Sequence, residues 1–440
     1  MRRLLKDGDR VAGALGYDRE RGRFKIFHAS AIVATGGVGR AFRITSNSWE
    51  YTGWTRAGVS RRRRSPGHGV RAVSPDGHGV ATECARHPGH RRGTRRGGVL
   101  RNSNGERFMF NDIPENYRAQ TADNEEEGGA IRRATRRRVA PELLTRDHVA
   151  RCIMREVRDG RGSPHGGVFL DIAWIKARLP NAAEHIRKKL PSMYHQFKQL
   201  ADIDITTTPM EVGPTTHYIM GGVRVDGDTQ MSSVPGLFAA GECAAGLHGA
   251  NRLGGNSLSD LLVFGKRAGE HAAKFARSVG AATIPESDLD AAAGRALAPF
   301  ERESGPSPYQ IQHELQDLMQ DLVGIVRREE EMQSALQRIG ALRERAAHVS
   351  VAGNREYNPG WHTALDLDNL LTVSEAITRS AIDRRESRGG HFRDDFPNKD
   401  PEAQRYNIVV RRGADGGMQL QRIAIPDLPA HLQQVIADEK

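Results

Sequence analysis

Some stretches of this chain contain the short apolar runs that are typical of strands, and others contain apolar residues at the spacing that is typical of helices. Residues 11–17 and 24–34 are apolar runs on either side of a charged turn, which predicts a hairpin returning into a buried strand. Residues 236–240 form another short apolar run between Pro235 and Gly241, which predicts a second buried strand. The first of these runs continues into Thr35, Gly36 and Gly37, a sequence that favours a tight glycine turn.

Apolar residues at helical spacing predict helices in much of the remaining chain. Residues 142–157 predict a helix whose apolar face includes Val149, Ile153, Met154 and Val157. Three later stripes predict a helical bundle, and we interpret them as its core rather than as cofactor contacts. They are Ile311, Leu315, Leu318, Leu322 and Ile325; Met332, Leu336, Ile339 and Leu342; and Leu367, Leu370, Leu371 and Ile377.

A loop with two glycines, residues 253–256, leads into a helix that is predicted to begin at Asn256 or Ser257. Ser257 and Asp260 have the spacing of a capping box. Four apolar residues at helical spacing predict one buried face, namely Leu258, Leu261, Leu262 and Ala268. The unpaired N–H groups and partial positive charge of such a helix end suit a phosphate or an anionic reduced flavin. For this loop by itself, an ordinary capped core helix is the alternative.

The net charge of +11 is concentrated in two stretches of the chain. Residues 54–96 contain 11 Arg and 2 acidic residues but no Leu, Ile, Met, Phe, Tyr or Lys, and residues 129–140 contain 5 Arg and no acidic residue. The rest of the chain is mildly acidic, so we expect no nucleic-acid partner. A stretch with so little apolar surface is not expected to order, because burial cannot offset the entropy lost.

The three cysteines, Cys84, Cys152 and Cys243, are isolated and form no C-x-x-C pair. Their isolation favours a reducing compartment and argues against a metal or iron–sulfur site built by this chain alone. No run reaches the roughly 18 to 20 apolar residues of a membrane helix, and the first residues lack the apolar core of a signal peptide.

The sequence HGANRLGGNSL at residues 248–258 is the most specific motif of the chain. It resembles the signature of the flavoprotein subunits of succinate dehydrogenase and fumarate reductase. The resemblance implies a fold with an α/β, Rossmann-like FAD-binding domain, an α+β capping domain, a C-terminal helical bundle and a small C-terminal segment containing strands. The implied boundaries are 1–53 and 213–277 for the FAD-binding domain, 54–212 for the capping domain, 278–385 for the helical domain and 386–440 for the last segment.

The sequence departs from this family in two ways. No G-x-G-x-x-G motif precedes residue 31, so the resemblance implies an incomplete, N-terminally truncated FAD-binding domain, and it leaves the family's flavin-attaching histidine without a place. Residues 54–96 and 129–140 replace family-like sequence, which leads to the hypothesis of two reading-frame slips; a basic disordered insert, for example one that binds RNA, is the alternative. Thr82 and Glu83 match a family motif only by chance in this interpretation.

The resemblance also implies the residues of the active site and the cofactor, FAD. Arg146 is expected to deliver the proton, while His217 and Arg252 bind the substrate carboxylates. Glu242 follows a predicted strand, where an acidic side chain can accept hydrogen bonds from ribose hydroxyls. Further cofactor contacts are expected in two places. One is the glycine turn at Thr35, Gly36 and Gly37, and the other is the predicted helix start at Asn256, Ser257 and Leu258. For Arg146, a surface pair with Glu142 is the alternative.

The resemblance implies that succinate and fumarate are interconverted by hydride transfer to or from FAD. The implied partners are an iron–sulfur subunit, a membrane anchor subunit, which would hold the chain at the cytoplasmic face of the cell membrane, and indirectly a quinone. The alternatives are an L-aspartate oxidase and a non-catalytic remnant of the flavoprotein subunit.

Overall fold

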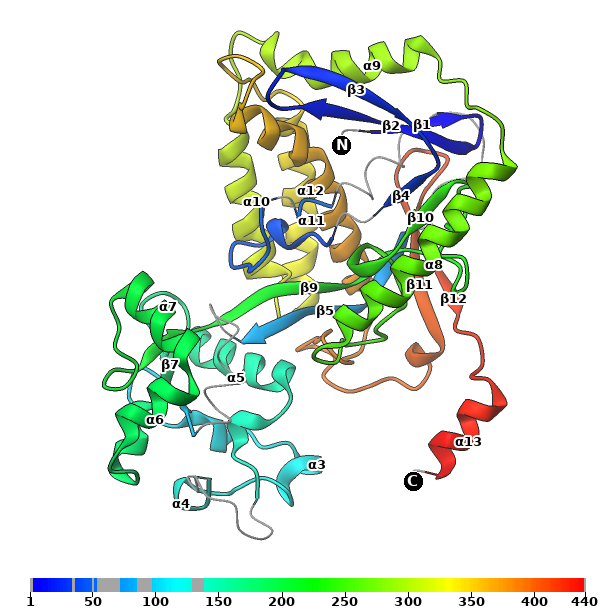
Figure 1. Cartoon of the computed structure of the whole chain (residues 1–440). Helices are drawn as coiled ribbons and strands as arrows, with labels where there is room; N and C mark the ends of the chain where they lie inside the picture. Colours follow the sequence, from blue (N-terminus) through cyan, green and yellow to red (C-terminus); the bar gives the residue numbers. More distant parts are fainter. Residues whose placement is uncertain are drawn as a thin grey trace.

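The computed structural model describes residues 3–33, 36–49, 51–53, 72–84, 97–128 and 138–438, which form a mixed α/β protein (Figure 1). The chain begins with an antiparallel sheet in the order β1-β2-β3, and β4 pairs in parallel with β10. This confirms the predicted hairpin and both predicted strands, of which β10 is buried. The bounds are β1 Arg3–Asp7, β2 Arg10–Asp18, β3 Arg23–His28, β4 Ala31–Val33 and β10 Leu237–Ala239.

A second group of elements, between residues 97 and 212, surrounds its own apolar core. Its antiparallel sheet has the order β6-β7-β8 and packs with the predicted helix of residues 142–157, which begins at Arg146. The bounds are β6 Val99–Arg101, β7 Val168–Asp171, β8 Met210–Val212, α3 Glu115–Arg118, α4 Glu125–Gly128, α5 Arg146–Arg158, α6 Ala182–Lys189 and α7 Pro191–Ala201.

A four-stranded antiparallel sheet, in the order β12-β11-β5-β9, connects distant parts of the chain. Its strand β5 lies within residues 54–96, where we expected no ordered structure, so that expectation is wrong for residues 72–84. The physical reason is that backbone hydrogen bonds to two neighbouring strands need no apolar side chains. The bounds are β5 Ala72–Cys84, β9 Pro214–Val223, β11 Tyr406–Arg412 and β12 Met418–Ala424.

Three helices, α10, α11 and α12, pack side by side as the predicted bundle (Figure 1). Most residues of the three predicted stripes are buried, which confirms the stripes as core. The same core includes Val38, Phe42 and Ile219, so the bundle packs directly against the turn after β4 and against β9. The bounds are α8 Asn256–Ser278, α9 Glu286–Leu297, α10 Pro308–Leu322, α11 Glu329–Ala346, α12 Pro359–Asp383 and α13 Ala430–Asp438.

The C-terminal segment contains β11, β12 and α13. Helix α13 lies away from the rest of the molecule in Figure 1 and has no buried residue. Among the helices that the structure describes, none combines the length and the apolar character needed to cross a membrane.

Candidate functional site

The carboxyl ends of β4 and β10 lie next to each other because the two strands are parallel, with Ala31 opposite Leu237. Gly36 and Gly37 follow β4, and Glu242 follows β10. A methyl group on Gly37 would lie 2.0 Å from Glu242 Oε1, so only glycine leaves room for this carboxylate. Glu242 Oε1 also accepts a hydrogen bond from the backbone of Ile219 at 2.9 Å. The glycine turn and the acidic residue are therefore brought together, whereas Thr35 lies outside the described residues.

Helix α8 begins at Asn256, after Gly255 with a φ of +91°. The predicted capping box is wrong, because no side chain caps this helix. Ser257 Oγ instead accepts a hydrogen bond from Arg252 Nη1 at 3.1 Å, and Asp260 turns towards other residues. The first turn of the helix therefore keeps N–H groups that no side-chain cap satisfies.

The apolar face of α8 differs from the prediction. Ala268 is buried, but Leu258, Leu261 and Leu262 are 69%, 54% and 77% exposed. The spacing correctly identified a helix, yet no described element covers its first two turns. The expectation that this face is anchored in the core is wrong for the three leucines.

A partly buried polar cluster lies beside the start of α8 and consists of Tyr218, His248, Arg252 and Asp260. The Tyr218 hydroxyl is 2.9 Å from His248 Nε2 and 3.4 Å from Asp260 Oδ2. The guanidinium carbon of Arg252 lies 4.6 Å from the centre of the Tyr218 ring, which is a cation–π contact. No role had been predicted for Tyr218 and His248, and Asp260 had been assigned to a capping box.

Burial controls the charges in this cluster. It raises the pKa of Asp260 and, with the charges of Asp260 and Glu242 added, that of Tyr218. Burial also lowers the pKa of His248, an effect that Asp260 opposes and Arg252 reinforces. The Tyr218 hydroxyl therefore stays protonated at neutral pH and can donate a hydrogen bond.

Two buried atoms of the same cluster have no hydrogen-bond partner among the described residues, namely Arg252 Nε and Asp260 Oδ1. Unsatisfied buried polar atoms are rare in folded proteins because each one costs about 1 to 3 kcal/mol. An unsatisfied guanidinium N–H beside an accessible helix end suits an anionic ligand. The residues present here thus fit both a cofactor at the start of α8 and a carboxylate at Arg252.

His217 lies on β9, next to Tyr218, and its side chain is partly buried. Its Nδ1 is 2.7 Å from Ser46 Oγ, and its carbonyl oxygen accepts a hydrogen bond from Asn47 Nδ2 at 2.9 Å. Ser46 fixes the orientation of the imidazole ring. Neither Ser46 nor Asn47 had been singled out in the sequence.

Arg146 begins α5 and reaches the loop before α8. A methyl group on Gly254 would lie 3.0 Å from Arg146 Nη2, so the guanidinium lies against this loop. The alternative, a surface ion pair between Arg146 and Glu142, is wrong because Glu142 is not at the surface. Glu142 is buried and accepts two hydrogen bonds from Arg107, at 2.6 and 2.9 Å. Arg146 therefore lies against the same loop that carries Arg252 and leads into Ser257.

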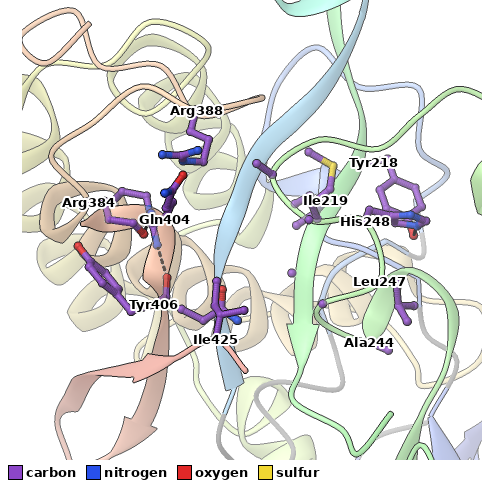
Figure 2. Close-up of a pocket in the computed structure, with 17 residues that line it drawn as sticks. Tyr218, Ile219, Ala244, Leu247, His248, Arg384, Arg388, Gln404, Tyr406 and Ile425 are labelled. Carbon is purple, nitrogen blue, oxygen red and sulfur yellow. Dashed lines mark hydrogen bonds between the residues drawn. The ribbon is translucent and has the colours of Figure 1, made fainter. Parts of the chain in front are cut away.

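A cavity of about 320 Å³ is lined on one wall by Tyr218 and His248 (Figure 2). Arg384, Arg388 and Tyr406 of the C-terminal part line its opposite wall, and Arg384 donates a hydrogen bond to the carbonyl of Tyr406 at 2.9 Å. Of the predicted site residues that the structure describes, none lines this cavity. The cavity, which had not been predicted from the sequence, therefore shares Tyr218 and His248 with the polar cluster.

Parallel strands that end in a glycine turn and an acidic residue, beside an accessible helix N-terminus, are features of enzymes that bind a dinucleotide cofactor. Comparison with known proteins agrees with this class. A family model described as FAD binding domain matches residues 1–258, and one described as fumarate reductase flavoprotein C-term matches residues 312–435. The chain belongs to the family of FAD-binding flavoprotein subunits found in succinate dehydrogenases and fumarate reductases.

Individual relatives have the same character. A component of the CoM/CoB fumarate reductase of Methanothermobacter marburgensis is 36% identical over 93% of this chain and 69% of its own length. The structure of Mycobacterium smegmatis Sdh1 in complex with UQ1 has a TM-score of 0.78 and 44% identity, over 97% of this chain and 67% of that one. A quinol–fumarate reductase with menaquinol molecules has a TM-score of 0.81 and 28% identity, over 97% of this chain and 72% of that one.

These findings confirm the predicted family, its FAD-dependent oxidoreductase class and its cofactor. They also confirm, at a coarser level, an FAD-binding domain followed by a flavoprotein C-terminal domain. The roles of individual site residues, the domain boundaries and the hypothesis of two frame slips stay predictions.

Proposed function

We propose that this chain interconverts succinate and fumarate as the flavoprotein subunit of a succinate dehydrogenase or fumarate reductase. The observation that supports this most is the position of Arg146 against the loop that carries Arg252 and leads into Ser257, where Arg252 Nε is buried without a partner among the described residues. A dicarboxylate dianion requires several cationic donors around it. Two arginines from separate elements, with His217 on β9 as a further donor, match that requirement.

Arg252 binds one substrate carboxylate in this proposal. A guanidinium group can form two parallel hydrogen bonds to a carboxylate, a geometry that lysine cannot copy. The Tyr218 ring holds the guanidinium by a cation–π contact, with its centre 4.6 Å from the guanidinium carbon. Ser257 Oγ accepts a hydrogen bond from Nη1 at 3.1 Å, which holds the guanidinium beside the start of α8.

His217 polarises the substrate by donating a hydrogen bond to a carboxylate oxygen. Ser46 Oγ lies 2.7 Å from Nδ1 and holds the imidazole ring in one orientation. Arg146 delivers or accepts the proton at the carbon next to the one that exchanges the hydride. A free guanidinium hardly deprotonates, but the carbanion-like carbon that it protonates is far more basic.

Glu242, Gly36 and Gly37 hold the cofactor at the end of β4 and β10, with Glu242 accepting from ribose hydroxyls. Asn256, Ser257 and Leu258 offer the backbone N–H groups of the first turn of α8. FAD, when bound, supplies the hydride acceptor or donor of the reaction. The exposure of Leu258 keeps this turn accessible, as such a contact requires.

We also propose the domain division given by the sequence. One core cluster contains only residues between 100 and 212, which supports a capping domain within residues 54–212. A second cluster joins the helices of the 278–385 domain to residues 38–42, which supports a bundle packed on the FAD-binding domain. We assign residues 1–53 and 213–277 to that domain and residues 386–440 to the C-terminal segment.

For the partners, we propose an iron–sulfur subunit that takes the electrons and a membrane anchor subunit that passes them to a quinone. Support comes from the quinone-bound complexes of the similar structures, which are named for UQ1 and menaquinol. The chain would then be attached peripherally to the cytoplasmic face of the membrane.

The proposed function is tested with the purified chain incubated with FAD. We expect retained flavin absorbance after gel filtration and fumarate-dependent oxidation of a reduced viologen dye. An Arg252→Gln change should lower kcat/KM for fumarate about 10- to 100-fold, because it removes charge-assisted hydrogen bonds. Arg267→Gln is the matched control, since Arg267 lies on α8 but pairs with Asp228 at the surface. Bound flavin without fumarate turnover, or a chain that retains no flavin, would contradict the proposal.

A further inference from the structure

Three potential metal ligands meet at α5, two of them on the helix itself. His148 and Cys152 lie four residues apart on α5, so both side chains project from one face of the helix. Asp112 follows the short helix of Phe108–Asn111 and approaches them from across the domain. The ligand atoms of all three side chains lie within 4.8 Å of one another.

Two of the three distances between the ligand atoms match a tetrahedral ion, and the third, between His148 and Asp112, is within 4.8 Å. Cys152 Sγ is 3.4 Å from His148 Nε2 and 3.5 Å from Asp112 Oδ2. Ligand atoms around tetrahedral zinc lie about 3.3 to 3.7 Å apart, given bonds of about 2.0 to 2.3 Å. The side chains would therefore need little movement to surround an ion.

Burial and charge also suit such an ion. His148 and Cys152 are 5% and 3% exposed, whereas the Asp112 side chain is 35% exposed and leaves one side open to water. Burial acts to raise the pKa of Asp112, but the charge and hydrogen bond of Arg155 outweigh it, so the carboxyl pKa is lowered and the group is ionised. Arg155 Nη1 donates to Asp112 Oδ2 at 2.7 Å, and that oxygen retains a second lone pair.

We propose that Asp112, His148 and Cys152 form a binding site for one Zn²⁺ ion, with water in the fourth position. A thiolate, an imidazole and a carboxylate together favour zinc over magnesium or calcium, which prefer oxygen ligands alone. The absence of paired cysteines had argued against any metal site in this chain. The third ligand is far away in sequence, so the spacing of cysteines could not indicate this one.

Binding releases one proton. The Zn–S bond replaces the S–H bond of Cys152, and that proton leaves to solvent. His148 Nε2 lies 2.6 Å from the carbonyl oxygen of Asp112, to which it donates its hydrogen without metal. On binding, that hydrogen moves to Nδ1 without net loss. Because binding releases this proton, zinc affinity should increase as the pH is raised.

Cobalt titration of the full chain tests the site, in a Cys84→Ser/Cys243→Ser double variant that keeps Cys152 as its only thiol. We expect one Co²⁺ per chain, with a thiolate-to-cobalt charge-transfer band and the intense visible bands of tetrahedral cobalt. One equivalent of Zn²⁺ should remove these bands. Absence of the charge-transfer band in a chain with native circular dichroism would overturn the proposal.

Ligand variants decide which side chains bind. His148→Gln should weaken cobalt binding by more than about 100-fold, since even residues outside the ligand shell typically account for 10- to 100-fold. His165→Gln is the matched control, because His165 is an exposed histidine of the same domain paired with Glu211. His148→Gln keeps the thiol, so it remains decisive even where Cys152→Ser fails to fold. Equal cobalt affinity in the His148→Gln and His165→Gln chains would overturn the proposal.

Discussion

Helices α8 and α12 have the same kind of apolar stripe but opposite surroundings. In α12, Leu367, Leu370 and Leu371 are at most 1% exposed, because α10 and α11 cover them. In α8, Leu258 and Leu262 are more than two thirds exposed. Helical spacing of apolar residues therefore predicts a helix and the need for a cover, but it does not tell what provides the cover.

The N-terminal ends of the two helices also differ, because only α12 has a side-chain cap. Asn358 caps α12 by accepting a hydrogen bond from the backbone of Trp361 at 2.9 Å, whereas Gly255 leaves α8 without a side-chain cap. A capped and covered helix is built for stability. An uncapped helix start beside Arg146 and Arg252 is suited to a ligand, as proposed above. Changes at α8 should therefore alter turnover, and changes in α12 should alter stability.

The largest effect is expected from Arg146→Lys, a change beside the start of α8, where we expect turnover to respond. Loss of a positioned proton donor should lower turnover about 10²- to 10⁴-fold while leaving the melting temperature unchanged. Steady-state fumarate reduction and thermal unfolding measure the two quantities. Arg151→Lys, further along α5 and paired with Asp147, is the matched control and should retain turnover. Equal turnover of the two variants would remove Arg146 from the mechanism.

A smaller effect, on stability alone, is expected from shortening one leucine in each helix. Leu370→Ala should lower the free energy of unfolding by about 2 to 5 kcal/mol, because it leaves a cavity in the bundle core. Leu262→Ala, at a side chain that is 77% exposed, should change it by less than about 0.5 kcal/mol. Urea unfolding of both variants compares them directly. A loss above about 2 kcal/mol for Leu262→Ala would mean that this face is covered in solution, and the contrast between the helices would fail.

The parts of the fold that the sequence predicted well are those with local causes. Apolar runs ending in glycine predicted β4 and β10, and helical spacing predicted the bundle. The contact between Gly37 and Glu242 has a further cause, because the parallel pairing of β4 and β10 brings the ends of both strands to one edge of a sheet. For the strands and the bundle the physical signal is local, within a short stretch of the chain.

The failures share long-range causes. Asp260 was assigned to a local capping box, but its carboxylate faces Tyr218, 42 residues earlier. Glu142 was considered as a partner for Arg146 one turn along the helix, whereas Arg107 binds it from 35 residues away. Residues 72–84 looked unable to order because composition ignores the backbone hydrogen bonds that β9 and β11 provide. Local patterns cannot report partners that only the tertiary fold supplies.

The smallest effect is expected at the two helix starts and tests the contrast in capping. Asn358→Ala should lower the free energy of unfolding by about 1 kcal/mol, because the backbone N–H of Trp361 loses its acceptor. Ser257→Ala should have little effect on stability, since Ser257 does not cap α8, but it releases Arg252 Nη1 and should raise KM for fumarate. Urea unfolding and steady-state kinetics on the same preparations separate the two outcomes. If Ser257→Ala destabilised the chain as much as Asn358→Ala does, Ser257 would act as a cap in solution, and the start of α8 would be built like that of α12.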